Sequence, residues 1–500
     1  MNSAVLHNTT VLYIRTFFSS LITIWSIRIL SERLGLTNYG ILNVILGLSV
    51  LIGSIQQALS TSGQKFITEA TLENGKNIRD IFMGQMLVIN VILAAVILLI
   101  GYTAGEYFIT EILTIPKDRM TSSIITFRLS LVLLAINIVL KPFTLLYFSY
   151  DDLSLFGILG ILESLMKLIL AYALIYFDQR LEWYLIGLIG IALLVNLLYV
   201  TRSVKKFDLR IRFRHTHFPF KQFLLSVGWN FIGSFSNTLS SQGQNLLLNI
   251  YFGPIANSAR AISVSVKNTV YLFASNIQLA LNSSVVRESN DKNLVKELQL
   301  LLVSTRIIFG TVVIVSLPLI IFTEEIFKLW LVDFSWSTVI FTRLILIELI
   351  IHSLSVPSES VMVAKDKLYH FQTIGGVILL SNLLISYPLL VFGGSAQIVY
   401  LSSICTTLVV VLYRLKLVEK VLEQPRYFII LKVISMILKM TSYSIPLVFI
   451  TFMDFDNLPF FTFVLTIFSV FCYLLLGSAL MLLRKEERQE LVLLIRSRIQ

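Results

Sequence analysis

Apolar stretches of about 20 residues follow one another along almost the whole chain, and this recurrence limits the possible folds most strongly. A water-soluble globule would instead gather its apolar residues into one core. The chain has 500 residues, of which 56% are hydrophobic and 14% charged. The stretches are far longer than the roughly 10 residues of a membrane-barrel strand, and they do not alternate with polar residues. The sequence therefore predicts an all-α polytopic membrane protein.

Measured against the length of a spanning helix, the sequence predicts about fourteen transmembrane helices. Their approximate bounds are 9–31, 40–63, 81–102, 122–146, 154–177, 183–201, 222–251, 258–284, 298–322, 337–362, 373–392, 396–413, 433–453 and 459–483. The largest loops are expected near 103–121 on one side and 202–221 on the other. The first span lacks a small-residue cleavage site after it, so we expect no cleavable signal peptide.

Basic residues are distributed unequally between the two sides of this topology. The loops on the side of the N-terminus, together with the C-terminal tail, carry about 25 Lys and Arg, against about 5 on the other side. The positive-inside rule then predicts that both termini are cytoplasmic. Most of the net charge of +11 follows from these loops. The basic run from Arg202 to Arg214 is interpreted as an anchor for acidic lipid head groups, and no nucleic-acid partner is expected.

A weak internal repeat gives the predicted domain organisation. Leu34-Gly35, followed by 57–62, resembles Phe252-Gly253, followed by 279–284. The two offsets differ by four residues, close to one helical turn. This match relates the first two spans to the seventh and eighth, and a shift of six spans preserves chain direction. The sequence thus favours two parallel six-helix lobes around a central cavity.

The predicted domains follow from the repeat. They are an N-terminal lobe at 1–202, a basic cytoplasmic linker at 203–221, a second lobe at 222–431, and two additional spans with a cytoplasmic tail at 432–500.

About ten Lys and Arg residues lie inside the apolar stretches, which is unfavourable. Each costs roughly 2.5–3.5 kcal/mol at the centre of a spanning helix, so such residues normally face a bundle interior or water. About three acidic residues within spans could neutralise them: Glu163, Glu348 and Glu359. Most of the cations therefore require water or an anionic ligand.

Two predicted helices present polar faces. Arg260, Lys267 and Gln278 lie within about 20° of one line on the eighth span. The amides of Gln242, Asn245 and Asn249 share one side of the seventh span. Such amides suit sugar hydroxyls, and hydrogen bonding between helices explains them equally well.

Glu163 and Lys167 are spaced i,i+4 on the fifth span and could form an ion pair. Either this pair is structural, or Glu163 titrates as part of coupling to a proton or sodium ion. Arg28, Lys141 and Arg343 lie nearer to span ends, where long stems can reach the interface. The complete set of predicted substrate-binding residues is Arg15, Arg28, Arg128, Lys167, Gln242, Asn245, Asn249, Arg260, Lys267 and Gln278.

Signatures of enzymes are missing from the sequence. The five His residues are scattered, and no phosphate-binding glycine loop is present. Cys405 and Cys472 both lie in apolar spans, which suggests neither a disulfide nor a thiolate site. We therefore predict a protein that is not an enzyme and uses no metal or cofactor. Transport driven by a gradient or by the substrate itself is what remains.

Several segments resemble a known family. The run from Tyr13 to Arg15, the segment Leu34–Ile41 and the segment Ser60–Phe66 resemble the start of bacterial polysaccharide repeat-unit flippases. Gln244–Gly253 and Ala256–Ile262 resemble the seventh and eighth spans of the same group. These flippases belong to the multidrug, oligosaccharidyl-lipid and polysaccharide exporter superfamily, which implies a MATE-like architecture. Arg15 and Arg260 match positions of this family.

The resemblance implies a flippase of the bacterial inner membrane. Such a protein carries an undecaprenyl-diphosphate-linked oligosaccharide from the cytoplasmic to the periplasmic leaflet by alternating access, for O-antigen of lipopolysaccharide, capsule or exopolysaccharide. Expected partners are this lipid, membrane lipids, glycosyltransferases and a polysaccharide polymerase. A diphosphate is multiply anionic, which suits buried Arg and Lys.

Two alternatives stay open. A multidrug cation antiporter of the same architecture would favour acidic residues in its cavity. A membrane glycosyltransferase or polysaccharide polymerase would need a large periplasmic loop or catalytic acids. The glycan, the coupling ion and the oligomeric state are not specified by the sequence.

Overall fold

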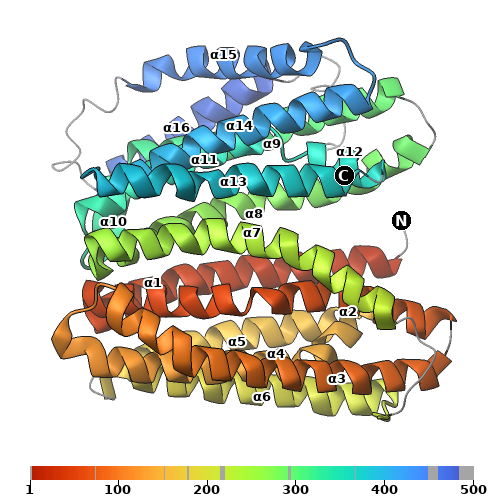
Figure 1. Cartoon of the computed structure of the whole chain (residues 1–500). Helices are drawn as coiled ribbons and strands as arrows, with labels where there is room; N and C mark the ends of the chain where they lie inside the picture. Colours follow the sequence, from red (N-terminus) through yellow and green to blue (C-terminus); the bar gives the residue numbers. More distant parts are fainter. Residues whose placement is uncertain are drawn as a thin grey trace. The chain divides into compact units, whose positions relative to one another are not determined.

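A computed structural model describes residues 3–73, 75–150, 152–176, 180–213, 220–290, 294–365, 367–448 and 460–482. Within these ranges the regular structure is helical, without a strand. Internal contacts divide the chain into two compact units (Figure 1). Unit 1 comprises Met1–Ala261 with Leu331–Phe334, and unit 2 comprises Ile262–Trp330 with Ser335–Gln500. The predicted all-α membrane fold is confirmed.

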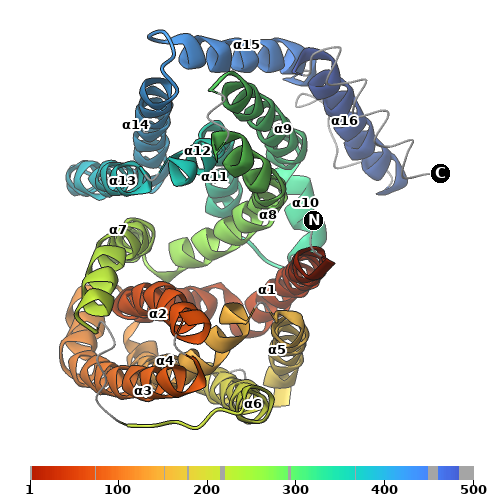
Figure 2. The ribbon, with the colours of Figure 1, turned by 90° about the vertical axis from the view of Figure 1, so that its right-hand side faces the viewer.

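Unit 1 is a bundle of long helices built around α4. Its helices are α1 (Ser3–Ile52), α2 (Ser54–Glu73), α3 (Gly75–Ile100), α4 (Met120–Ser149), α5 (Ser154–Ala173), α6 (Leu181–Phe207) and α7 (Phe220–Phe252). Helix α4 packs against α1, α2, α3 and α6, and α7 packs against α1 and α2 (Figure 2). Buried residues such as Phe82, Leu146 and Phe223 form its core.

Two glycines bend the chain of unit 1 in the same way. Gly35 has φ 72° inside α1, and Gly253 has φ 72° between α7 and α8 (Pro254–Asn290). This left-handed conformation favours glycine because it has no Cβ. The two residues are the ones that the predicted repeat aligns. At Gly40, a Cβ would lie 1.8 Å from the Pro254 carbonyl oxygen, so the segments after the two bends touch.

Unit 2 is formed by α8 from Ile262 onward and the helices that follow. These are α9 (Leu294–Ile321), α10 (Thr323–Trp330), α11 (Trp336–Ser353), α12 (Ser358–Ala364), α13 (Leu368–Val391), α14 (Ile398–Val421), α15 (Phe428–Val448) and α16 (Phe460–Met481). Helices α15 and α16 pack on each other, α15 on α14, and α16 on α9. Leu301, Val418 and Leu474 belong to the shared core.

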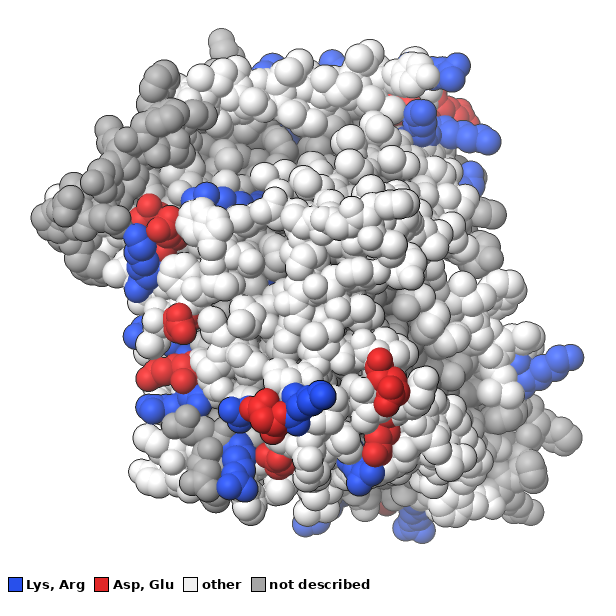
Figure 3. Space-filling model, turned by 60° about the vertical axis from the view of Figure 1, so that its left-hand side comes forward, with Lys and Arg blue, Asp and Glu red and all other residues white. Residues whose placement is uncertain are grey.

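Every predicted span overlaps a helix, but fewer helices are apolar enough to be recognised by hydropathy. Eleven helices in the described ranges are long and apolar enough to cross a membrane. The first of them, Val11–Ile52, joins the first predicted span to the start of the second. Helices α2, α7 and α8 are absent from the eleven because their sequences carry many polar residues. Large uncharged areas cover the surface shown in Figure 3, as a lipid-facing protein requires.

Several sequence expectations differ from the structure. The predicted span 337–362 is two helices, because a turn containing Pro357 separates α11 from α12. The predicted loop 103–121 is partly helical, since π-helical turns at Gly101–Gly105 and Phe108–Ile112 extend α3. The compact units divide within α8, and α7 packs on α1 and α2. The domain bounds with a linker at 203–221 stay a prediction. The arrangement as two six-helix lobes stays a prediction.

Candidate functional site

A pocket of about 330 Å³ opens inside unit 1, between α1, α2, α4 and α7. It is lined by Val50, Gly53, Ser54, Gln56, Gln57, Ser60, Leu134, Lys141 and Thr238. Lys141 is the charged member of this lining, and its ammonium has no hydrogen bond or ion pair within the described ranges. The surrounding amides and hydroxyls can donate to or accept from oxygen atoms of a ligand. We refer to this cavity as the Lys141 pocket.

Helix-breaking residues shape the Lys141 pocket. Gly53 lies at the break between α1 and α2, where the N–H of Gln56 donates to the Gly53 carbonyl at 2.9 Å. Pro142 follows Lys141 in α4 and provides no N–H for the carbonyl of Ile138. The Nδ2 of Asn90 donates to that carbonyl at 2.8 Å, which satisfies it. Lys141 is therefore held on a helix whose local irregularity is compensated.

Arg15 lies near Lys141 in the same unit. Its guanidinium carbon is 3.8 Å from the centre of the Phe156 ring, and a Cβ on Gly160 would lie 1.9 Å from its Nε. The absence of a side chain at Gly160 thus makes room for Arg15. Its Nε is buried and has no hydrogen-bond partner within the described ranges.

Three cations share one carboxylate at this place. Arg15 and Lys141 both interact electrostatically with Glu163. Glu163 also accepts from the Nζ of Lys167 at 2.6 Å, which confirms the predicted i,i+4 pair. Arg15, Lys141, Lys167 and Glu163 together carry a formal surplus of positive charge. We call these four residues the unit 1 cation cluster.

The predicted amides of α7 are engaged inside unit 1. Asn249 accepts from the N–H of Thr114 at 2.9 Å and donates to Asn257 at 2.8 Å. Asn257 in turn donates to the Oδ1 of Asn245 at 2.8 Å. Gln242 lies against the backbone of Gly47, where a Cβ would be 2.4 Å from its Oε1. Hydrogen bonding between segments, one of the two open explanations, accounts for Asn245 and Asn249.

The polar line predicted on α8 is divided between the two units. Arg260 is buried in unit 1 and donates to the carbonyl of Ser241 at 2.9 Å. Lys267 belongs to unit 2, where its Nζ lies 3.4 Å from the Oε2 of Glu348. Gln278 donates to the carbonyl of Val356 at 3.2 Å.

Glu348 has further hydrogen-bond partners besides Lys267. Its Oε1 accepts from Ser403 at 3.1 Å and from Thr407 at 3.2 Å, so three groups stabilise the carboxylate. The sequence identified Glu348 as a neutralising acid, and the structure confirms that it pairs with one of the intramembrane cations. Pairing with Glu348 therefore accounts for the charge of Lys267 inside the membrane without a ligand.

Two other predicted cations lie at more exposed places. Arg128 makes a bidentate pair with Glu106, with nitrogen–oxygen distances from 2.8 to 3.1 Å, and its side chain is 47% exposed. The guanidinium of Arg28 lies 5.5 Å from the centre of the Trp25 ring. Neither residue lines the Lys141 pocket.

Arg414 was not predicted from the sequence. It lies on α14, almost buried, with its guanidinium carbon 4.3 Å from the centre of the Phe371 ring. Its Nε has no hydrogen-bond partner within the described ranges, and Glu359 interacts with it electrostatically. The predicted span ended at 413, just before this residue. The helix continues in the same hydrophobic pattern to Val421, and this pattern could have indicated that Arg414 lies within the span.

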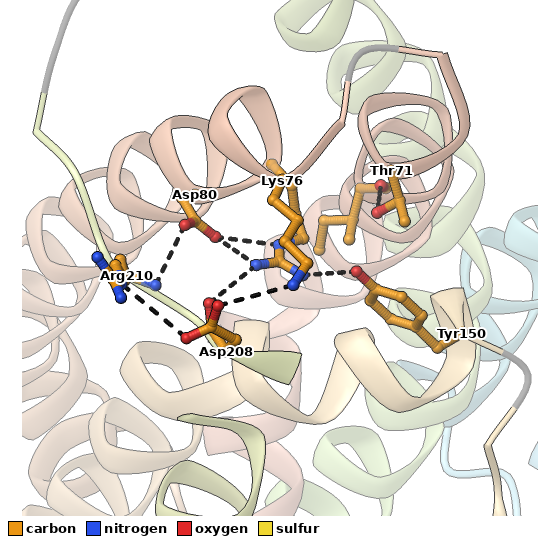
Figure 4. Close-up of polar contacts among 8 residues, drawn as sticks. Thr71, Lys76, Asp80, Tyr150, Asp208 and Arg210 are labelled. Carbon is orange, nitrogen blue, oxygen red and sulfur yellow. Dashed lines mark hydrogen bonds and ion pairs between the residues drawn. The ribbon is translucent and has the colours of Figure 1, made fainter. Parts of the chain in front are cut away.

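A charged network, buried at Arg79 and Asp80 and exposed at Lys76 and Asp208, holds the end of unit 1 where α6 ends (Figure 4). Arg79 is 0% exposed and donates to Asp80 at 2.6 Å and to the hydroxyl of Tyr150 at 2.5 Å. Asp80 accepts from the N–H of Arg210 at 3.2 Å, and Lys76 lies 3.6 Å from Asp208. These contacts fasten the segment after α6 to the start of α3, which is a structural role.

Comparisons with known proteins show which solved structures share this fold. No protein-family model matches the chain, and no curated protein matches it. Solved structures do. The lipid II flippase MurJ in an inward closed conformation matches with TM-score 0.70 and 15% identity, over 94% of this chain and 98% of that chain.

Two further matches are transporters. An inward-facing multidrug resistance MATE family transporter of the MOP superfamily matches with TM-score 0.69 and 13% identity, over 82% of this chain and 98% of that chain. A MOP superfamily transporter from Pyrococcus furiosus, described as having a binding pocket of reverse polarity, matches with TM-score 0.63 and 13% identity, over 84% and 95%. The protein is therefore a multi-pass membrane protein with the fold of MOP superfamily transporters and of the flippase MurJ.

Proposed function

We propose that the protein is a flippase that moves undecaprenyl-diphosphate-linked oligosaccharide repeat units from the cytoplasmic to the periplasmic leaflet of a bacterial inner membrane. The product would supply O-antigen, capsule or exopolysaccharide synthesis. The observation that supports this proposal most is the charge surplus of the unit 1 cation cluster. There, Arg15 and Lys141 share a carboxylate that Lys167 already binds.

An anionic ligand explains this surplus physically. A cation away from water is unfavourable unless it is paired, and Arg15 and Lys141 lack a hydrogen-bonded anion within the described ranges. A diphosphate offers several anionic oxygens to both residues. The amides of Gln56 and Gln57 and the hydroxyls of Ser60 and Thr238 line the Lys141 pocket and suit sugar or phosphate oxygens.

The membrane orientation that we propose follows from the basic loops. Both termini and the segment 202–213 would be cytoplasmic, where they contact acidic lipid head groups. The Lys141 pocket would then be exposed to each leaflet in turn, while the polyprenyl chain stays in lipid. Glycosyltransferases would supply the lipid-linked substrate, and a polysaccharide polymerase would consume it. A role of Glu163 in ion coupling stays a prediction.

Lipid binding tests the proposal directly. In nanodiscs, the purified protein should bind undecaprenyl diphosphate more tightly than uncharged polyprenol. Each charged contact is worth about 1.5–3 kcal/mol, so Arg15→Ala combined with Lys141→Ala should weaken diphosphate-lipid binding at least tenfold. Polyprenol binding should not change. Arg128→Gln is the matched control, because Arg128 is paired and does not line the pocket.

Two outcomes would contradict the proposal. Equal affinity for the charged and the uncharged lipid would remove the role of the cations. Tight binding of organic cations in place of the lipid would favour the multidrug antiporter, whose cargo has the opposite charge.

A further inference from the structure

A second pocket, of about 290 Å³, lies in unit 1 at the beginning of α6. It is lined by Arg33, Leu34, Asn38, Arg119, Ser122, Arg180 and Leu181. Helix α6 runs from Leu181 to Phe207, so this pocket and the basic segment 202–213 lie at opposite ends of the helix. We propose that this arginine pocket is a binding site for a phosphate or diphosphate group, separate from the Lys141 pocket.

Three arginines from distant parts of the sequence line the arginine pocket. Arg33 comes from α1 just before the Gly35 bend, Arg119 precedes α4, and Arg180 precedes α6. Like charges repel one another, so an anion bound near Arg33 and Arg119 would lower the cost of bringing them together. Asp118 pairs with Arg119 at 3.1 Å, but both side chains are at least half exposed, which makes this pair weak.

Arg33 gives an independent indication of a ligand. Its Nε is buried and has no hydrogen-bond partner within the described ranges. A buried donor without a partner is costly, and a bound oxygen atom would remove that cost. The nearby acids Glu32 and Glu182 do not line the pocket.

Two helix N-termini add to this positive environment. Arg119 and Arg180 are the N-cap residues of α4 and α6, and neither helix has a side-chain hydrogen bond at its N-cap. The N–H of Met120 donates to the Lys117 carbonyl in the turn before α4, and the dipoles of both helices favour negative charge at their N-termini. Ser122, in the first turn of α4, adds a hydroxyl. Helix N-termini combined with guanidinium groups are suited to phosphate oxygens.

The size and location of the pocket narrow its ligand. Its volume is near the lower limit of about 300 Å³ for small-molecule pockets, which suits a phosphate or diphosphate group better than an oligosaccharide. Three arginines at the end opposite the basic loops also depart from the charge bias of the topology. On the proposed function, the pocket would receive the diphosphate of the lipid after it has crossed. A phospholipid head group presents the same chemistry.

Soluble inorganic pyrophosphate is the probe that tests the site. Binding to the full-length protein in nanodiscs of neutral lipid would be measured by calorimetry, with Arg33→Gln and Arg180→Gln each expected to weaken it at least tenfold. Lys117→Gln is the matched control, because Lys117 is exposed in the same turn as Arg119 and does not line the pocket. Arg33→Lys should restore part of the binding if charge is what Arg33 supplies.

Three outcomes would overturn the site: no pyrophosphate binding, equal binding by Arg33→Gln and wild type, or tighter binding of glucuronate than of pyrophosphate. Competition experiments identify the molecule that supplies the phosphate group. Anionic phosphatidylglycerol in the nanodisc should displace the probe if bilayer lipid occupies the site, and polyprenyl diphosphate should displace it if cargo does. Arg128→Gln, which changes neither pocket, should leave pyrophosphate binding unchanged. Pyrophosphate binding by Arg33→Gln tests the arginine pocket, and the preference for undecaprenyl diphosphate over polyprenol tests the proposed function, so the failure of each is visible separately.

Discussion

Two intramembrane cation sites, one in each unit, are stabilised in opposite ways. In unit 2, Lys267 faces Glu348, whose second oxygen is held by Ser403 and Thr407. In unit 1, Arg15 and Lys141 share Glu163 with Lys167 and gain no hydrogen bond from it. Cations that are paired within the protein stabilise its fold. Cations in excess of the nearby carboxylates can bind an anionic ligand. The difference directs the search for a bound anion to the unit 1 cation cluster rather than to Lys267.

The sharpest way to break this comparison is to remove the charge of Lys141. Lys141→Ala should lower the initial rate of lipid flipping at least tenfold, because a contact worth about 1.5–3 kcal/mol is lost. Lys141→Arg should keep part of the rate, since the charge remains and the geometry changes. The rate is measured in proteoliposomes with a fluorescent polyprenyl-diphosphate sugar. A wild-type rate in the Ala variant would place the anion elsewhere.

The pair in unit 2 should respond differently. Lys267→Met leaves the partly buried Glu348 without its cation and should lower the free energy of unfolding by about 3 kcal/mol, at the low end for a broken buried pair. The double change of Lys267→Met with Glu348→Gln should recover much of that loss. Thermal unfolding in detergent measures both. If Lys267→Met unfolds like wild type and still abolishes flipping, Lys267 is a ligand-binding residue and the contrast between the units is wrong.

The two glycine bends provide a smaller, structural test. Gly35→Ala and Gly253→Ala should each destabilise the protein by about 1–2 kcal/mol, because an L-residue pays for the left-handed conformation while the added Cβ meets no close atom. Gly40→Ala should cost more, since its Cβ would clash with the Pro254 backbone. The free energies of unfolding of the three variants, compared with that of the wild type, test this order. A Gly40 variant as stable as wild type would contradict the close approach of the two bends.

The fold could be predicted from the sequence because its main signal is local. A run of apolar residues specifies a spanning helix without knowledge of its neighbours, and each predicted span overlaps a helix. The errors fall where a tertiary environment permits exceptions. Pro357 splits a predicted span, and π-helical turns continue α3 into a predicted loop. The packing of α7 on α1 and α2 joins segments far apart in the sequence, which a local pattern does not specify.

The candidate site was less predictable. Lys141 was expected to reach the interface from near a span end, and the structure places it on a pocket lined by four helices. Asn137 and Lys141 share a face of α4 at i,i+4. This polar face is the sequence feature that could have indicated a pocket beside Lys141. Charge alone did not separate Arg15, whose Nε has no hydrogen-bond partner among the described residues, from Arg128, which pairs with Glu106. That distinction depends on residues distant in sequence.

The hydrogen bonds that α7 makes within unit 1 have a consequence for biosynthesis. Ser62 is joined to Asn230, 168 residues later, and Thr114 to Asn249, 135 residues later. At ordinary rates of translation, on the order of ten seconds separate the emergence of these partners from the ribosome. During that interval the polar groups of α2 are in the bilayer before their α7 partners exist. Ser62 and Thr114 therefore reach their final hydrogen bonding only after α7 has been synthesised.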